Sequence, residues 1–174
     1  MSVGDWLIFA GFACLSIVMA VQDIRTLKVS RALSLLLLGL ELVASLFDAA
    51  GNRAVIEVLL STTIALLIFM LVRLLSGRLE DGRRKLGLAD VFYSGSMGAY
   101  LGFIGWLEGC VLACILALII SAVNVAFAQK ESLERERPEF EAAFARHQAR
   151  SKPIPFVACL AAGALAVKLI EALR

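Results

Sequence analysis

The stretch VIEVLLSTTIALLIFMLVRLL, residues 55–75, decides the fold class, because its only charged residues, Glu57 and Arg73, lie near its two ends. A helix needs about 20 predominantly apolar residues to cross the hydrocarbon core of a bilayer. Hydrophobic residues make up 60% of the 174-residue chain, and the mean hydropathy is +0.86. A soluble domain is usually about half apolar. The stretch therefore predicts a transmembrane helix.

Five more apolar runs flank residues 55–75, and together they predict an all-α membrane protein with six transmembrane helices. The runs are Trp6–Val21, Ala32–Phe47, Val91–Leu107, Cys110–Ala128 and Pro155–Ile170. Short charged stretches separate the runs, so we expect residues 1–174 to form a single transmembrane domain. The first run follows Asp5 rather than a basic segment, which favours a retained helix over a signal peptide.

The basic residues predict how the helices are oriented. Most of the Lys and Arg residues lie in the first, third and fifth connections between the apolar runs. Basic loops remain in the cytoplasm, so these three connections are expected to face it and both termini to lie outside. The fifth connection, residues 129–152, alternates charged and aromatic residues. It predicts either an amphipathic helix near the membrane surface or a solvated linker helix.

Two aspartates are the candidate functional residues. Asp23 directly follows the first apolar run, and Asp90 directly precedes the fourth, so the charge pattern places both at the cytoplasmic boundary. Two carboxyl groups in one site repel each other when both are ionised, so one of them stays protonated. Such a pair can activate water against a peptide bond. In the structural alternative, Asp23 pairs with Arg25 and Asp90 caps a helix N-terminus.

Three other features bear on the bundle and on bound metals. Gly98 and Gly102 form a G-x-x-x-G step, which predicts close packing against a neighbouring helix. Glu41 lies within the second apolar run, where it would pair with a polar group, be protonated, or lie nearer the outer surface. The four cysteines form no C-x-x-C pair, so we expect neither a metal site nor a cofactor.

Motifs around the two aspartates resemble those of the type IV prepilin peptidases. Gly87-Leu88-Ala89-Asp90 is similar to the G-x-G-D motif of membrane aspartic proteases. Asp23, after a first helix and before a short basic stretch, resembles the other catalytic aspartate of that family. Pro155 and Phe156 match the family's I-P-F segment. The resemblance covers the whole chain and implies that Asp23 and Asp90 are catalytic. The supporting residues would be Gly87, Ala89, Gly98, Gly102, Pro155 and Phe156.

The chain departs from the family pattern at three places. Ala89 replaces the second motif glycine, and Phe92 stands where the family often has a lysine. Ser30 lies in a Val-Ser-Arg turn in place of Ile-Pro-Asn. Alanine is the smallest possible change from glycine, so these differences concern substrate preference more than chemistry. They also leave room for a divergent or inactive member.

The resemblance implies an enzyme that removes the short cytoplasmic leader from prepilins or pseudopilins at the bacterial inner membrane. It further implies a peptidase-only form without methyltransferase activity, because the chain lacks the paired cysteines of the bifunctional enzymes. We expect the lipid bilayer and a substrate with a basic leader and an apolar helix as partners, and no nucleic acid. The alternative is a non-enzymatic six-helix protein, such as a small transporter or an inactive assembly subunit.

Overall fold

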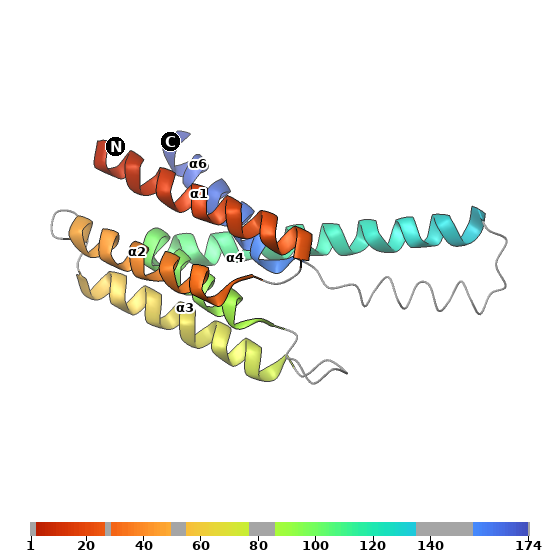
Figure 1. The fold of residues 1–174 in the computed structure, drawn as a ribbon, viewed down its shortest axis with the longest axis horizontal. Coiled ribbons are helices and arrows are strands. Elements are labelled where there is room, and N and C mark those ends of the chain that lie inside the picture. Colours follow the sequence, from red (N-terminus) through yellow and green to blue (C-terminus); the bar gives the residue numbers. More distant parts are fainter. Residues whose placement is uncertain (1–2, 27–28, 50–54, 77–85, 135–154, 174) are drawn as a thin grey trace.

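The computed structural model describes residues 3–26, 29–49, 55–76, 86–134 and 155–173. All secondary structure in these residues is α-helical: α1 (Val3–Thr26), α2 (Arg31–Ala49), α3 (Val55–Leu75), α4 (Leu88–Glu134) and α6 (Phe156–Leu173). The helices form one bundle, and the C-terminal part of α4 projects beyond the ends of the others (Figure 1). The predicted segment 129–152 lies largely outside the described residues.

Four of the described helices are long and apolar enough to cross a membrane. They contain the stretches Trp6–Thr26, Val55–Leu75, Leu88–Phe127 and Phe156–Leu173. An all-helical membrane protein therefore agrees with the sequence. The six spans and the outward-facing termini stay predictions.

The chain reverses direction inside α4, at Gly102. This glycine has φ 73° and ψ −179°, which no helical residue adopts. The indole Nε1–H of Trp106 donates a hydrogen bond to Ser94 Oγ at 2.8 Å. In a straight helix, residues twelve apart are separated by about 18 Å. Residues 88–101 and 103–134 are therefore two antiparallel segments, as the reversal of α4 in Figure 1 also shows.

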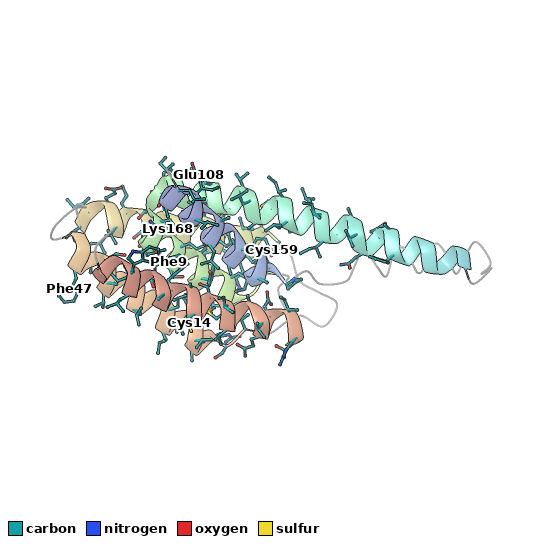
Figure 2. The ribbon with its side chains drawn as sticks, turned by 90° about the horizontal axis from the view of Figure 1, so that it is seen from above. Phe9, Cys14, Phe47, Glu108, Cys159 and Lys168 are labelled. Atoms are coloured by element: carbon teal, nitrogen blue, oxygen red, sulfur yellow. The ribbon has the colours of Figure 1, made fainter. Side chains whose placement is uncertain are left out.

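This reversal corrects two sequence expectations. The predicted boundary between Leu107 and Cys110 is wrong, because the chain turns at Gly102 instead. Glu108, which lies between those two predicted runs, is an exposed residue of the second segment (Figure 2). Gly102 was also expected to be a packing residue, whereas its role is to reverse the backbone.

Small residues bring the first segment of α4 close to α3 and α2. A Cβ at Gly98 would lie 2.8 Å from the Ser61 carbonyl oxygen, so the close packing expected there is present. Ser61 Oγ donates to the Gly98 carbonyl at 2.9 Å, and Ser45 Oγ donates to the Ala99 carbonyl at 3.0 Å. Small residues and interhelical hydrogen bonds are the usual means of packing helices in lipid. They fix the segment that carries Asp90.

A similar contact between α6 and α4 gives a testable prediction. A Cβ at Gly163 would collide with the backbone carbonyl oxygen of Gly109. Gly163→Ala is therefore expected to lower the free energy of unfolding by about 2 kcal/mol, as overpacking does. Unfolding in detergent, followed by circular dichroism, measures the change.

Gly39→Ala is the matched control, because a Cβ at Gly39 meets nothing within 4 Å. Alanine is the better helix former by up to about 1 kcal/mol, so this variant should be as stable as the wild type or more so. Equal unfolding free energies for the two variants would contradict the tight contact between α4 and α6.

Candidate functional site

The two candidate aspartates lie at the same end of the bundle. The C-terminal end of α1 and the N-terminal ends of α4 and α6 meet there (Figure 1). Both residues are buried: Asp23 is 7% exposed and Asp90 is 8% exposed. The charges of the two carboxyl groups interact electrostatically. The structure thus brings together two buried acids that are far apart in sequence.

Asp90 is held by the start of its own helix. The Gly87 N–H donates a hydrogen bond to Asp90 Oδ2 at 2.7 Å. Because α4 begins at Leu88, Asp90 reaches back to the residue before the helix, as the acidic residue of a capping box does. A Cβ at Gly87 would lie 3.1 Å from the same oxygen, so glycine leaves room for this contact. The capping alternative is therefore realised, and it also orients the carboxyl group.

Asp23 is held by a different helix. The Ala158 N–H donates to Asp23 Oδ2 at 3.2 Å. Since α6 begins at Phe156, this N–H is one of the first four in the helix, which have no partner within it. Arg25 is exposed, and no ion pair between it and Asp23 occurs in the part of the chain that the structure describes. Asp23 therefore binds the N-terminus of α6 rather than its basic neighbour.

Arg73 is a site residue that the sequence reasoning missed. Its guanidinium Nε–H donates to the Leu86 carbonyl at 3.2 Å, which fixes the chain just before Gly87. Its charge also acts on the carboxyl group of Asp90. The sequence contained a signal for this role, because an arginine within an otherwise apolar span is energetically costly and tends to be functional. Arg73 was interpreted only as one of the basic residues that orient the helices, so its place at the site was not predicted.

Pro155 and Phe156 build the α6 end of the site. The Pro155 carbonyl accepts the Cys159 N–H at 3.3 Å and so begins the helix. The ring of Phe156 packs against that of Phe69 on α3, with centroids 6.2 Å apart. These contacts place the N-terminus of α6 where Asp23 binds it. Ala89, the substituted motif residue, is buried at the start of α4.

A hydrogen bond takes the place of the missing proline between α1 and α2. The Ser30 N–H donates to Gln22 Oε1 at 3.4 Å, and the Ser30 carbonyl accepts the Ser34 N–H at 3.1 Å. Ser30 therefore stands at the N-cap of α2, a position that serine favours. The Gln22 contact ties this cap to the residue beside Asp23. The departure at Ser30 is thus compatible with a capped start of α2.

The described residues include no group of three or more His, Cys, Asp and Glu side chains that could hold a metal ion. His147, the single histidine of the sequence, lies outside these residues. The chemistry available at the site is that of two interacting carboxyl groups, each oriented by a backbone N–H.

Comparison with known proteins identifies the family. Residues 10–122 match the model of the type IV leader peptidase family, and the match includes both aspartates. Searches of curated proteins and of solved structures found no significant match. The matched region begins within α1, includes α2 and α3, and covers most of α4 with the turn at Gly102. On this match, the chain belongs to the type IV leader peptidase family.

Proposed function

We propose that the protein is an aspartic endopeptidase that removes the short leader from prepilins or pseudopilins. One observation carries the proposal: Asp23 and Asp90, from different helices, are both buried at one end of the bundle and interact electrostatically. Membership of a peptidase family supports the same reaction class. Paired carboxyl groups of this kind hydrolyse peptide bonds without a covalent intermediate.

In the proposed mechanism the two carboxyl groups share one proton. The ionised one takes a proton from a water molecule, whose oxygen attacks the scissile carbonyl carbon. The protonated one donates to the carbonyl oxygen, which gives a tetrahedral intermediate. A proton then passes to the amide nitrogen and the C–N bond breaks. The pair titrates as a unit, so acid and base roles belong to the pair.

The surroundings of the site support a position at the cytoplasmic face of the bacterial inner membrane. Arg25 and Arg73 lie in the last turns of α1 and α3, at the same end of the bundle as the aspartates. Basic helix ends remain in the cytoplasm. A substrate with a basic leader and an apolar transmembrane helix would place its junction at this depth.

The rival proposal is a non-enzymatic or inactive family member. Both aspartates hold helix N-termini, and an inactive protein would use them in the same way. The test is incubation of the purified protein in detergent with a prepilin, followed by mass spectrometry of the new N-terminus. The wild type is expected to cleave at the junction between leader and apolar helix. Protein carrying both Asp23→Asn and Asp90→Asn is the blank, and equal cleavage by it would contradict the proposal.

A further inference from the structure

Glu41 is a buried acid that the proposed chemistry does not use. It lies in α2, is 0% exposed, and neither carboxyl oxygen has a hydrogen-bond partner among the described residues. A buried polar group without a partner costs about 1–3 kcal/mol, and a charged one costs more. Ionisable residues inside a helical membrane bundle are rare and usually functional. Glu41 therefore lies inside the bundle, while its depth in the bilayer stays a prediction.

Two further polar residues lie with Glu41 inside the bundle. Tyr93, on the first segment of α4, is 0% exposed and interacts electrostatically with Glu41. Its hydroxyl donates to Ser16 Oγ on α1 at 2.8 Å, and Ser16 is also 0% exposed. We call Glu41, Tyr93 and Ser16 the buried polar cluster. It joins α1, α2 and α4.

The buried polar cluster connects the two helices that carry the aspartates. Tyr93 follows Asp90 by three residues, or about 4.5 Å along α4. Ser16 precedes Asp23 by seven residues, or about 10 Å along α1. The hydrogen bond between Tyr93 and Ser16 therefore fixes α1 against α4. It lies one to two helical turns away from the two aspartates along their helices. A change in this contact would alter the separation of the two aspartates.

We propose that Glu41 is a positioning residue for this site, with a neutral carboxyl group that supports the contact between Tyr93 and Ser16. Among the described residues no cation is bonded to Glu41, so an ionised carboxylate there would be uncompensated, whereas a protonated one needs only an acceptor. The Tyr93 oxygen can accept, because its own proton is donated to Ser16. A hydrogen bond from the protonated Glu41 carboxyl group to this oxygen would hold α2 against the pair. The inference rests on the proposed peptidase function.

The test compares Glu41→Leu with Glu41→Gln in the cleavage assay. Glu41→Leu removes the polar group at similar volume and is expected to lower kcat about tenfold with KM unchanged. Its thermal stability should stay close to that of the wild type, because the Tyr93 hydroxyl still donates to Ser16 and no polar group is left without a partner. Glu41→Gln keeps a neutral hydrogen-bonding group and should retain at least half of the wild-type kcat. A residue with a merely structural role would lower stability instead.

Coupling within the cluster is measured by a second set of variants. Tyr93→Phe is expected to lower kcat, and to add little further loss in the Glu41→Leu background, because the residues act together. Thr63→Ala is the control. It removes an exposed hydrogen bond within α3, the one to the Leu59 carbonyl, and should leave kcat unchanged.

An infrared difference spectrum tests the protonation state without any substrate. The wild type minus Glu41→Gln should show the carbonyl band of a protonated carboxylic acid. The inference is overturned if that band is missing, if Glu41→Leu cleaves at the wild-type rate, or if Glu41→Gln is as slow as Glu41→Leu. Failure of the peptidase proposal is distinguishable: the double asparagine variant would cleave like the wild type while the infrared band remained.

Discussion

Asp90→Asn is expected to lower kcat for leader removal by about 100- to 10,000-fold while leaving the fold intact. This is the usual contribution of one acid–base group. The asparagine side chain retains an oxygen that can accept the Gly87 N–H, the contact that Asp90 makes at 2.7 Å. The start of α4 is therefore preserved. What is lost is a group that exchanges a proton with water or with the scissile carbonyl.

Asp90→Ala separates the two roles of this residue. Alanine removes the proton-exchanging group and also the partner of the Gly87 N–H. Loss of a cap costs about 0.5–2 kcal/mol, so the alanine variant should be less stable than the asparagine variant and equally inactive. Thermal unfolding in detergent and the cleavage assay measure both effects. If the asparagine variant retained the wild-type rate, Asp90 would be only a cap.

The helices could be predicted where the local pattern of apolar and charged residues determines their bounds. The apolar stretch of residues 55–75 became α3 with the same bounds, because charge near both ends marks where the apolar run stops. Asp23 and Asp90 were recognised as candidate functional residues for a related reason: an acidic residue beside an apolar run is energetically costly at membrane depth. Neither inference required knowledge of which helices pack together.

The remaining features depend on contacts between distant parts of the chain. Asp23 and its partner Ala158 are 135 residues apart, and no local pattern predicts that pairing. Glu41 was recognised as unusual, but its burial depends on how α2 packs against α4. The turn within α4 was not predicted, because a hydropathy profile contains no information on the backbone conformation of a single glycine such as Gly102, with φ 73°.

Gly102→Ala is expected to lower the free energy of unfolding by about 3 kcal/mol, the upper end of the usual cost of backbone strain. The combination of φ 73° and ψ −179° lies in a region that essentially only glycine adopts. Relief of the strain would open the turn between the two segments of α4. The hydrogen bond from Trp106 to Ser94 would then be lost. Trp106 is only 2% exposed in the structure, and its side chain would leave the core.

Tryptophan fluorescence measures this change directly in a Trp6→Phe background, because the chain has two tryptophans. Cleavage should fall as well, since the first segment of α4 carries Asp90 and is held in place by the turn. Gly11→Ala is the control: a Cβ there meets nothing within 4 Å, so its stability should not fall. If Gly102→Ala unfolded at the wild-type temperature with unchanged Trp106 emission, α4 would not depend on a glycine to reverse. The antiparallel arrangement that positions Asp90 would then need another cause.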